Sequence, residues 1–306
     1  MSEIIKEIYE RPIRAIELLC KGCYNSVWIL GKAGTGKSYH TDQTLLEHKE
    51  DSIIFTGDTS ECCLHAFLYK NRTKTIVFRD TAKLIRRLNF IDTLKNLTEM
   101  NKDRTISRLV KKQTDDTTPD TFVFEGKIIM EFNEIGNKYR EDLEALFTRG
   151  DFVELTLSKE QMANVMLEIA KTELEKEVTR YLIANSYLLG HINFNLRTQQ
   201  KVLAVAKICL IEKKDWKEDL DMLFKSEMSE GKKLLYQFSG LKQAKRMEFI
   251  KYLIGTKRWS LATCQRRISE WLWLEEIYSN GLQKQAMLSI VPIKQKEEIC
   301  QINQEI

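Results

Sequence analysis

The sequence predicts an α/β fold built on a doubly wound parallel sheet, followed by an all-helical region. Two observations favour this fold class. Five short, continuously apolar segments alternate with stretches of helical periodicity between residues 26 and 157, and strand-like segments stop after Ser158. Strands of parallel sheets are continuously apolar because helices cover both faces of the sheet. The alternation therefore predicts repeated strand–helix–strand units.

The composition is that of a folded protein. Of 306 residues, 43% are hydrophobic and 30% are charged, which is far from the composition of disordered chains. No apolar run approaches the roughly 20 residues that cross a bilayer, and the first residues hold acidic side chains without a signal-peptide core. We expect a cytoplasmic protein, in a host cytoplasm if it is viral, with no membrane partner.

The predicted elements follow one another without long gaps. An amphipathic helix over residues 2–21 precedes the first strand. The strands are expected at 26–30, 52–57, 74–78, 126–132 and 151–157. Helices are expected at 37–50, at 60–71, up to about 97, near 140–147, and repeatedly from 158 to about 275.

The loop after the first strand carries the strongest motif. The segment GKAGTGKS fits G-x-x-x-x-G-K-[ST] and lies between a predicted strand and a predicted helix. Glycines let backbone N–H groups converge on phosphate oxygens, and the lysine and serine suit the β/γ-phosphates and Mg²⁺. We therefore expect ATP with Mg²⁺, bound by Gly31, Lys32, Ala33, Gly34, Thr35, Gly36, Lys37, Ser38 and Tyr39.

Hydrolysis also needs an acid near the metal. In the segment KTIVFRDT, Asp80 ends the third apolar strand, where such an acid is expected. Arg79 precedes it in place of a second acid, so either Asp80 ligates magnesium alone or the site is partly degenerate. Asp80 could instead cap a helix. Asp58 and Glu131 are the alternative metal acids.

In the order of these motifs, residues 26–157 resemble an AAA+ ATPase, a P-loop family with a five-stranded core and a helical lid. The resemblance implies roles for three further residues. Asn133, after GKIIMEF, matches the sensor 1 position near the attacking water. Arg149 matches an arginine that reaches a neighbouring subunit, and Arg197 matches sensor 2 in the lid. Alone, each of these residues could equally be a turn residue or a solvated surface charge.

The resemblance also suggests a division of the chain. Residues 1–157 form the AAA+ core, 158–230 the helical lid, 231–280 a basic helix-turn-helix that can take winged-helix form, and 281–306 a polar tail. An arginine that acts on a neighbouring subunit implies a homo-oligomer, such as a hexameric ring.

Positive charge is concentrated late in the chain. Residues 241–273 hold eight basic and two acidic side chains, a net charge of +6 where the whole chain has +4. Two helices around the break GTKRW have the layout of a helix-turn-helix, with Ser260 as the cap of the second and Leu261 among its core residues. A DNA partner is expected, held by Lys257, Arg258, Arg266 and Arg267. The alternative is a solvated helical pair that closes the lid.

A second basic stretch, residues 101–113, lies between the third and fourth predicted strands. In ring-forming relatives this part projects toward the central channel. Its basic residues could grip nucleic acid there or form a charged surface loop; they are Lys102, Arg104, Arg108, Lys111 and Lys112.

We expect an ATPase that acts on DNA, such as a replication-associated helicase, initiator or helicase loader of a mobile element or virus. The rival hypothesis is a nucleotide-switched DNA-binding or assembly module with little hydrolysis, which Arg79 favours. A protein-remodelling ATPase ranks last, because no aromatic-hydrophobic-Gly tripeptide follows the second strand.

Overall fold

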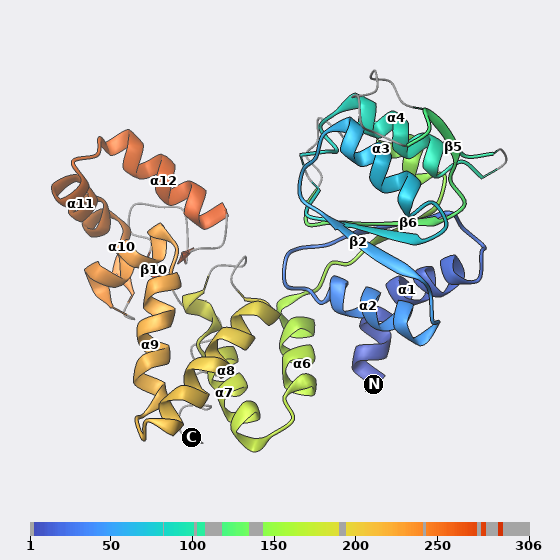
Figure 1. Cartoon of the computed structure of the whole chain (residues 1–306). Helices are drawn as coiled ribbons and strands as arrows, with labels where there is room; N and C mark the ends of the chain where they lie inside the picture. Colours follow the sequence, from blue (N-terminus) through green and yellow to red (C-terminus); the bar gives the residue numbers. More distant parts are fainter. Residues whose placement is uncertain are drawn as a thin grey trace. The chain divides into compact units, whose positions relative to one another are not determined.

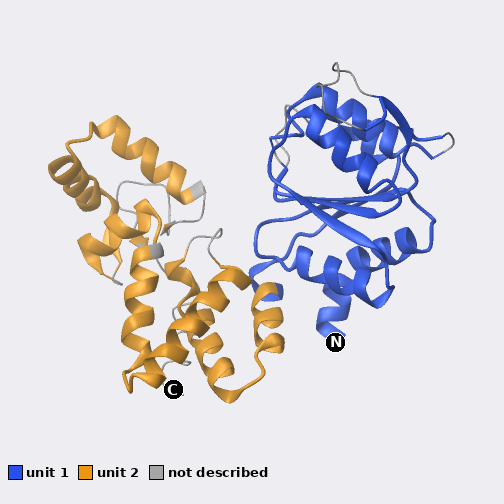
Figure 2. Cartoon of the chain, viewed as in Figure 1, with its two compact units in different colours: residues 1–161 blue, residues 162–306 orange. Residues whose placement is uncertain are grey.

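The structure is a computed structural model of the whole chain, which divides into two compact units, Met1–Gln161 and Met162–Ile306 (Figure 2). It describes residues 3–81, 83–100, 103–107, 118–134, 143–189, 194–240, 243–273, 277–279 and 287–289.

The first unit is built on a five-stranded parallel sheet in the order β2-β3-β6-β1-β7. Its strands are β1 (Ser26–Leu30), β2 (Ser52–Thr56), β3 (Thr75–Arg79), β6 (Lys127–Phe132) and β7 (Asp151–Glu154). All five predicted strands are present, although β7 ends three residues earlier than expected. The predicted α/β fold class is confirmed.

Helices cover both faces of this sheet (Figure 1). One face packs against α1 (Glu3–Cys20) and α2 (Lys37–Glu47), the other against α3 (Glu61–Lys70) and α4 (Leu88–Leu97). Side chains alternate between the faces: Val27 and Ile29 of β1 lie in the core beneath α1, and Trp28 lies in the opposite core. Of the helix predicted near 140–147, residues 143–147 are described and helical.

The described part of the second basic stretch, residues 103–107, includes strand β4 (Thr105–Ser107), which pairs antiparallel with β5 (Thr121–Val123). Arg104 does not project into solvent as a nucleic-acid grip requires. Its guanidinium donates to the Leu97 carbonyl at 3.2 Å and to the Gly126 carbonyl at 2.5 Å, and burial lowers its pKa. Arg104 is therefore structural. The other four basic residues of that prediction, Lys102, Arg108, Lys111 and Lys112, lie outside the described residues.

Helices follow β7, as predicted: α6 (Lys159–Ile169), which begins in the first unit and continues into the second, then α7 (Glu173–Ala184), the short η1 (Ser186–Leu188), α8 (Leu196–Ile211) and α9 (Trp216–Glu227). Local sequence sets their starts. Thr172 and Glu175 form a capping box at α7, and the Asn195 side chain accepts the Thr198 N–H at the start of α8.

The last elements form a winged-helix arrangement. They are α10 (Glu230–Ser239), β8 (Ala244–Lys245), α11 (Arg246–Lys257), α12 (Leu261–Trp273), β9 (Tyr278–Ser279) and β10 (Met287–Ser289), and the strands pair antiparallel in the order β8-β10-β9. Ser260 caps α12 as expected. Two expectations fail here: Leu261 is 49% exposed instead of buried, and β10 comes from the predicted polar tail.

Among the described residues, no helix combines the length and the apolar character that crossing a bilayer requires.

Candidate active site

The loop between β1 and α2 has the backbone of a phosphate cradle. Gly34 and Gly36 have φ of 75° and 87°, values that side chains disfavour. At Gly31 there is no room for a Cβ atom, which would lie 2.6 Å from the Leu155 carbonyl oxygen. Helix α2 begins at Lys37, directly after the loop. Its first N–H groups and its dipole therefore attract an anion at this end.

Lys37 is folded into the loop. Its side chain is buried, and Nζ donates to the carbonyl oxygens of Gly31 and Lys32 and to Asn133 Oδ1, the last at 3.2 Å. Asn133 follows β6, the neighbour of β1 in the sheet. The structure thus brings together two residues that the sequence predicted to act on the same phosphate.

Ser38 contacts an acid on β6. Its hydroxyl donates to Glu131 Oε2 at 2.5 Å, and the Glu131 side chain is only 4% exposed. Strand register explains the contact. Glu131 lies opposite Ile29 and has the parity of Ile129, so it faces the side of the sheet that α2 covers.

Arg79 holds the same carboxylate. At the end of β3, its Nε lies 3.1 Å from Glu131 Oε2 and its Nη2 lies 3.3 Å from Oε1. Nη2 also donates to Asp42 Oδ1 at 2.7 Å and to the Ser38 carbonyl at 3.3 Å. Burial lowers the pKa of this guanidinium, but its interactions with Asp42 and Glu131 together raise the pKa by more, so the pKa of Arg79 is raised overall.

Asp80, the predicted metal acid, is not brought to Ser38. It has a φ of 52° and an exposed side chain, and it forms no hydrogen bond or ion pair with another described residue. Asp58, an alternative acid, is paired with Arg87 at 2.8 Å. Of the acids considered from the sequence, Glu131 is the one in contact with Ser38.

Tyr9 of α1 supports the loop from behind. It is fully buried, and its hydroxyl donates to the Thr35 carbonyl at 2.7 Å. Its ring stacks on His40 of α2, with centroids 3.8 Å apart. Burial raises the pKa of Tyr9 to about 12 and lowers the pKa of His40 to about 4, so both groups are neutral at pH 7.

Of the two further predicted arginines, Arg149 lies away from the phosphate loop of its own unit, and Arg197 belongs to the second unit. Arg149 precedes β7, at the amino ends of the parallel strands. There it donates to the Lys95 carbonyl at 2.6 Å and pairs with Glu99 at 3.3 Å. The phosphate loop follows the carboxyl end of β1, about 16 Å away along the strand. Arg197 is exposed on the first turn of α8 in the second unit.

Of the predicted DNA-binding residues, Lys257 ends α11, Arg258 follows it in the turn, and Arg266 and Arg267 lie on α12. Lys257, Arg258 and Arg266 are exposed, while Arg267 is half-buried and pairs with Glu270 at 3.3 Å. Arg258 occupies the turn itself with a φ of 54°. On the opposite side of α12, Cys264, Ile268 and Trp271 are buried, as predicted. The helix therefore presents a basic face and packs with an apolar one.

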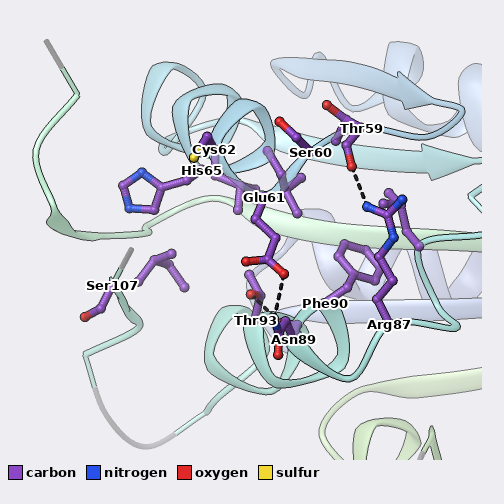
Figure 3. Close-up of a pocket in the computed structure, with 14 residues that line it drawn as sticks. Thr59, Ser60, Glu61, Cys62, His65, Arg87, Asn89, Phe90, Thr93 and Ser107 are labelled. Atoms are coloured by element: carbon purple, nitrogen blue, oxygen red, sulfur yellow. Dashed lines mark hydrogen bonds between the residues drawn. The ribbon is translucent and has the colours of Figure 1, made fainter. Parts of the chain in front are cut away.

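A small pocket lies on the other side of the sheet, between α3 and α4 (Figure 3). Its volume is about 40 Å³, which suits a water molecule and is far below the size of nucleotide sites. Hydrogen bonds within its wall join Arg87 to the Thr59 carbonyl and Asn89 to Glu61, each at 2.6 Å. The pocket is thus a packing feature away from the phosphate loop.

Two contributors to the site were missed by sequence reasoning. Tyr9 carries no motif, and only the packing of α1 on α2 places it. The contact of Arg79 with Glu131 could have been predicted from the sequence. Arg79 in TIVFR and Glu131 in KIIMEF are charged residues in otherwise apolar strands, at positions that face a covering helix.

Comparison with known proteins adds similarity of fold. No protein-family model and no curated protein sequence matches the chain. Among solved structures, the chain resembles a DNA replication initiation factor, with 14% sequence identity and a TM-score of 0.43. The alignment covers 86% of this chain and 72% of the other. It also resembles the Thermotoga maritima RuvB Holliday junction branch migration motor, with 11% identity, 97% of this chain, 94% of the other and a TM-score of 0.48. A third match is the FIGL-1 AAA domain in complex with ADP, with 13% sequence identity and a TM-score of 0.41. The alignment covers 68% of this chain and 70% of that domain.

These identities of 14% or less and TM-scores below 0.5 carry no part of the fold assignment, which rests on the chain's own features. A five-stranded parallel core, a phosphate loop between β1 and α2, Asn133 after the neighbouring strand, and helices in the second unit all match the arrangement expected from the sequence. The first unit therefore has the five-stranded parallel core and the phosphate loop that the sequence predicted from its resemblance to AAA+ ATPases.

Proposed function

We propose that this chain binds and hydrolyses ATP at its phosphate loop and uses the nucleotide to act on DNA. The observation that carries the proposal is the hydrogen bond from Lys37 to Asn133. It lies beside a glycine-rich loop that leads directly into the N-terminus of α2. A cation and an amide within one hydrogen bond of each other can contact the γ-phosphate and the attacking water together.

The residues of the loop have separable tasks. Its N–H groups and Lys37 bind phosphate oxygens, Asn133 orients water, and the Ser38 hydroxyl faces the metal position. Oxygen donors from Ser38 and Glu131 fit the preference of Mg²⁺, although the Arg79 guanidinium shares that carboxylate. Magnesium, when bound, supplies positive charge to the β- and γ-phosphates.

Two arginines complete this proposal. Arg149 lies at the amino ends of the parallel strands, whereas its own phosphate loop lies at their carboxyl ends. It therefore acts on the nucleotide of a neighbouring subunit in a homo-oligomer, for which we propose a hexameric ring. Arg197, at the start of α8, serves the nucleotide from the lid. The proposed functional divisions remain 1–157, 158–230, 231–280 and 281–306.

DNA is the proposed partner because of the winged-helix arrangement and its charge. Lys257, Arg258 and Arg266 are exposed around α12, in a segment of net charge +6. Exposed cations at this spacing can neutralise several backbone phosphates. A replication-associated helicase, initiator or helicase loader of a mobile element or virus would combine these two activities.

Lys37→Ala tests the nucleotide site. We expect the variant to lose ATP binding, measured by isothermal titration, and ATP turnover, measured by phosphate release. Circular dichroism serves as the control for folding, because Lys37 is buried. Retention of wild-type ATP binding by a folded Lys37→Ala protein would refute the proposed site.

A nucleotide-switched DNA-binding module with little hydrolysis is the second candidate. The contact of Arg79 with Glu131 favours it, because a fixed cation occupies the acid beside Ser38. The two candidates differ in turnover. The switch binds ATP and changes its DNA affinity or assembly while phosphate release stays near background, whereas the ATPase releases phosphate through many cycles.

A further inference from the structure

We propose that Glu131, on the strand next to the one expected to carry the metal acid, is the carboxylate that serves nucleotide-bound magnesium, and that Arg79 competes with the metal for it. This inference rests on the proposed nucleotide site and specifies how that site holds its metal. The chain therefore takes its acid from β6 instead of the end of β3.

The geometry of Ser38 and Glu131 fits two ligands of one ion. Neighbouring ligands of octahedral Mg²⁺, each about 2.1 Å from the metal, lie about 3 Å apart. Ser38 Oγ and Glu131 Oε2 are 2.5 Å apart, with the carboxylate buried beneath the first turn of α2. A small shift of either side chain admits a cation between them, directly or through a bound water.

Asp80 lacks this geometry. Residues 77 and 79 of β3 face α2, and Asp80 follows them with a left-handed φ of 52° and an exposed side chain. The position next to Ser38 that an acid at the end of β3 would occupy is taken by Arg79, whose Nη2 donates to the Ser38 carbonyl at 3.3 Å.

Arg79 makes the metal site conditional. Its guanidinium contacts both oxygens of Glu131, including the oxygen that receives the Ser38 hydroxyl. Any cation at this oxygen must share it with the guanidinium or displace it. Asp42 offers the guanidinium a second carboxylate, bound through Nη2 and Nη1 at 2.7 and 3.2 Å, so Arg79 can release Glu131 without becoming unpaired.

The test measures binding of mant-AMPPNP, a fluorescent non-hydrolysable ATP analogue, as Mg²⁺ is added. The quantity compared is the Mg²⁺ concentration that gives half of the magnesium-dependent binding. Four variants should differ in their effects on this concentration. Glu131→Gln keeps the size of the side chain and should raise this concentration at least tenfold. Arg79→Gln removes the competitor and should lower it several-fold. Asp42→Asn strengthens the hold of Arg79 on Glu131 and should raise it, while Asp80→Asn should change it less than twofold.

Binding in EDTA provides the internal control, because each variant that still binds the analogue without metal has a folded loop. If Glu131→Gln or Arg79→Gln does not fold, Glu131→Asp and Arg79→Lys take their places, with smaller shifts in the same directions. A shift with Asp80→Asn but none with Glu131→Gln would overturn the assignment, and a raised requirement in Arg79→Gln would overturn the competition. Wild-type protein that binds no analogue at any Mg²⁺ concentration would instead refute the nucleotide site itself.

Discussion

Lys37 Nζ lies 3.2 Å from Asn133 Oδ1, so the first residue of α2 and the first residue after β6 are joined at the phosphate loop. This contact gives the two residues different expected phenotypes. Lys37 is bonded to the loop itself, whereas Asn133 reaches it from the next strand.

Asn133→Ala should reduce turnover more than binding. The phosphate cradle and Lys37 remain in the variant, but the group that orients water is removed. We expect kcat for ATP to fall at least tenfold, as when one polar group that contacts a transition state is removed, with the ATP dissociation constant changed less than threefold. Steady-state phosphate release and isothermal titration measure the two quantities. The control is Asn89→Ala, at the pocket between α3 and α4; equal kcat values in the two variants would exclude a role for Asn133 in hydrolysis.

Tyr9→Phe should weaken ATP binding through the backbone of the loop. The variant keeps the ring that stacks on His40 and lacks only the hydrogen bond to the Thr35 carbonyl. A hydrogen bond of this kind contributes about 1 kcal/mol, which corresponds to about a fivefold loss of affinity if the bond stabilises the bound conformation of the loop. Tyr69→Phe, on α3 at the opposite face, is the matched control. Equal ATP affinities of the two variants, with Tyr9→Phe only less heat-stable, would show that Tyr9 serves stability alone.

The strand patterns predict this part of the site better than the motifs do. Arg79 and Glu131 each occupy an inward position near the end of an apolar strand, where an unpaired charge would be costly. From the alternation of side chains alone, the two residues could have been expected to share the face under α2 and to form a pair. The motif order instead directed attention to Asp80, because it matched a position along the chain and not a face of the sheet.

Other features required the tertiary structure. The five strands and the start of α2 follow from local apolar runs and glycines. Tyr9 contacts Thr35 only because α1 packs on α2, and β10 exists only because Met287 and Leu288 pair with β8. Arg104 looked like part of a basic surface, but the carbonyl oxygens of Leu97 and Gly126 hold its guanidinium inside the unit. These three contacts join residues far apart in sequence and leave no periodic pattern by which they could be predicted.

Arg149 should act between subunits. Arg149→Ala and Lys37→Ala should each be nearly inactive alone, because one lacks the arginine and the other the phosphate site. Mixed in equal amounts, they form interfaces in which an intact loop meets an intact Arg149, and we expect phosphate release to exceed the sum of the separate activities. In its own chain Arg149 binds the Lys95 carbonyl and Glu99, so thermal unfolding must show that the variant is folded. A mixture that gives only the sum would contradict action in trans.

The winged helix should bind duplex DNA with a strong salt dependence. Replacing Lys257, Arg258, Arg266 and Arg267 by Ala should reduce the slope of log affinity against log salt by about 0.9 for each DNA phosphate that the variant no longer neutralises. Turnover without DNA should persist, because the phosphate loop is in the first unit. The charge-matched control replaces four exposed lysines of that unit by Ala: Lys6, Lys21, Lys70 and Lys83. Fluorescence anisotropy measures both slopes, and an equal reduction in the two variants would place DNA binding elsewhere.

The most direct test of the central claim is steady-state phosphate release by the wild-type protein with Mg²⁺–ATP, measured without DNA, with single-stranded DNA and with duplex DNA. The proposed ATPase that acts on DNA predicts turnover in all three samples, with a higher kcat in at least one DNA sample, and no turnover in the Lys37→Ala variant. Turnover that stays at background with and without DNA, in protein that binds ATP, would contradict hydrolysis and leave the nucleotide-switched module as the function of this chain.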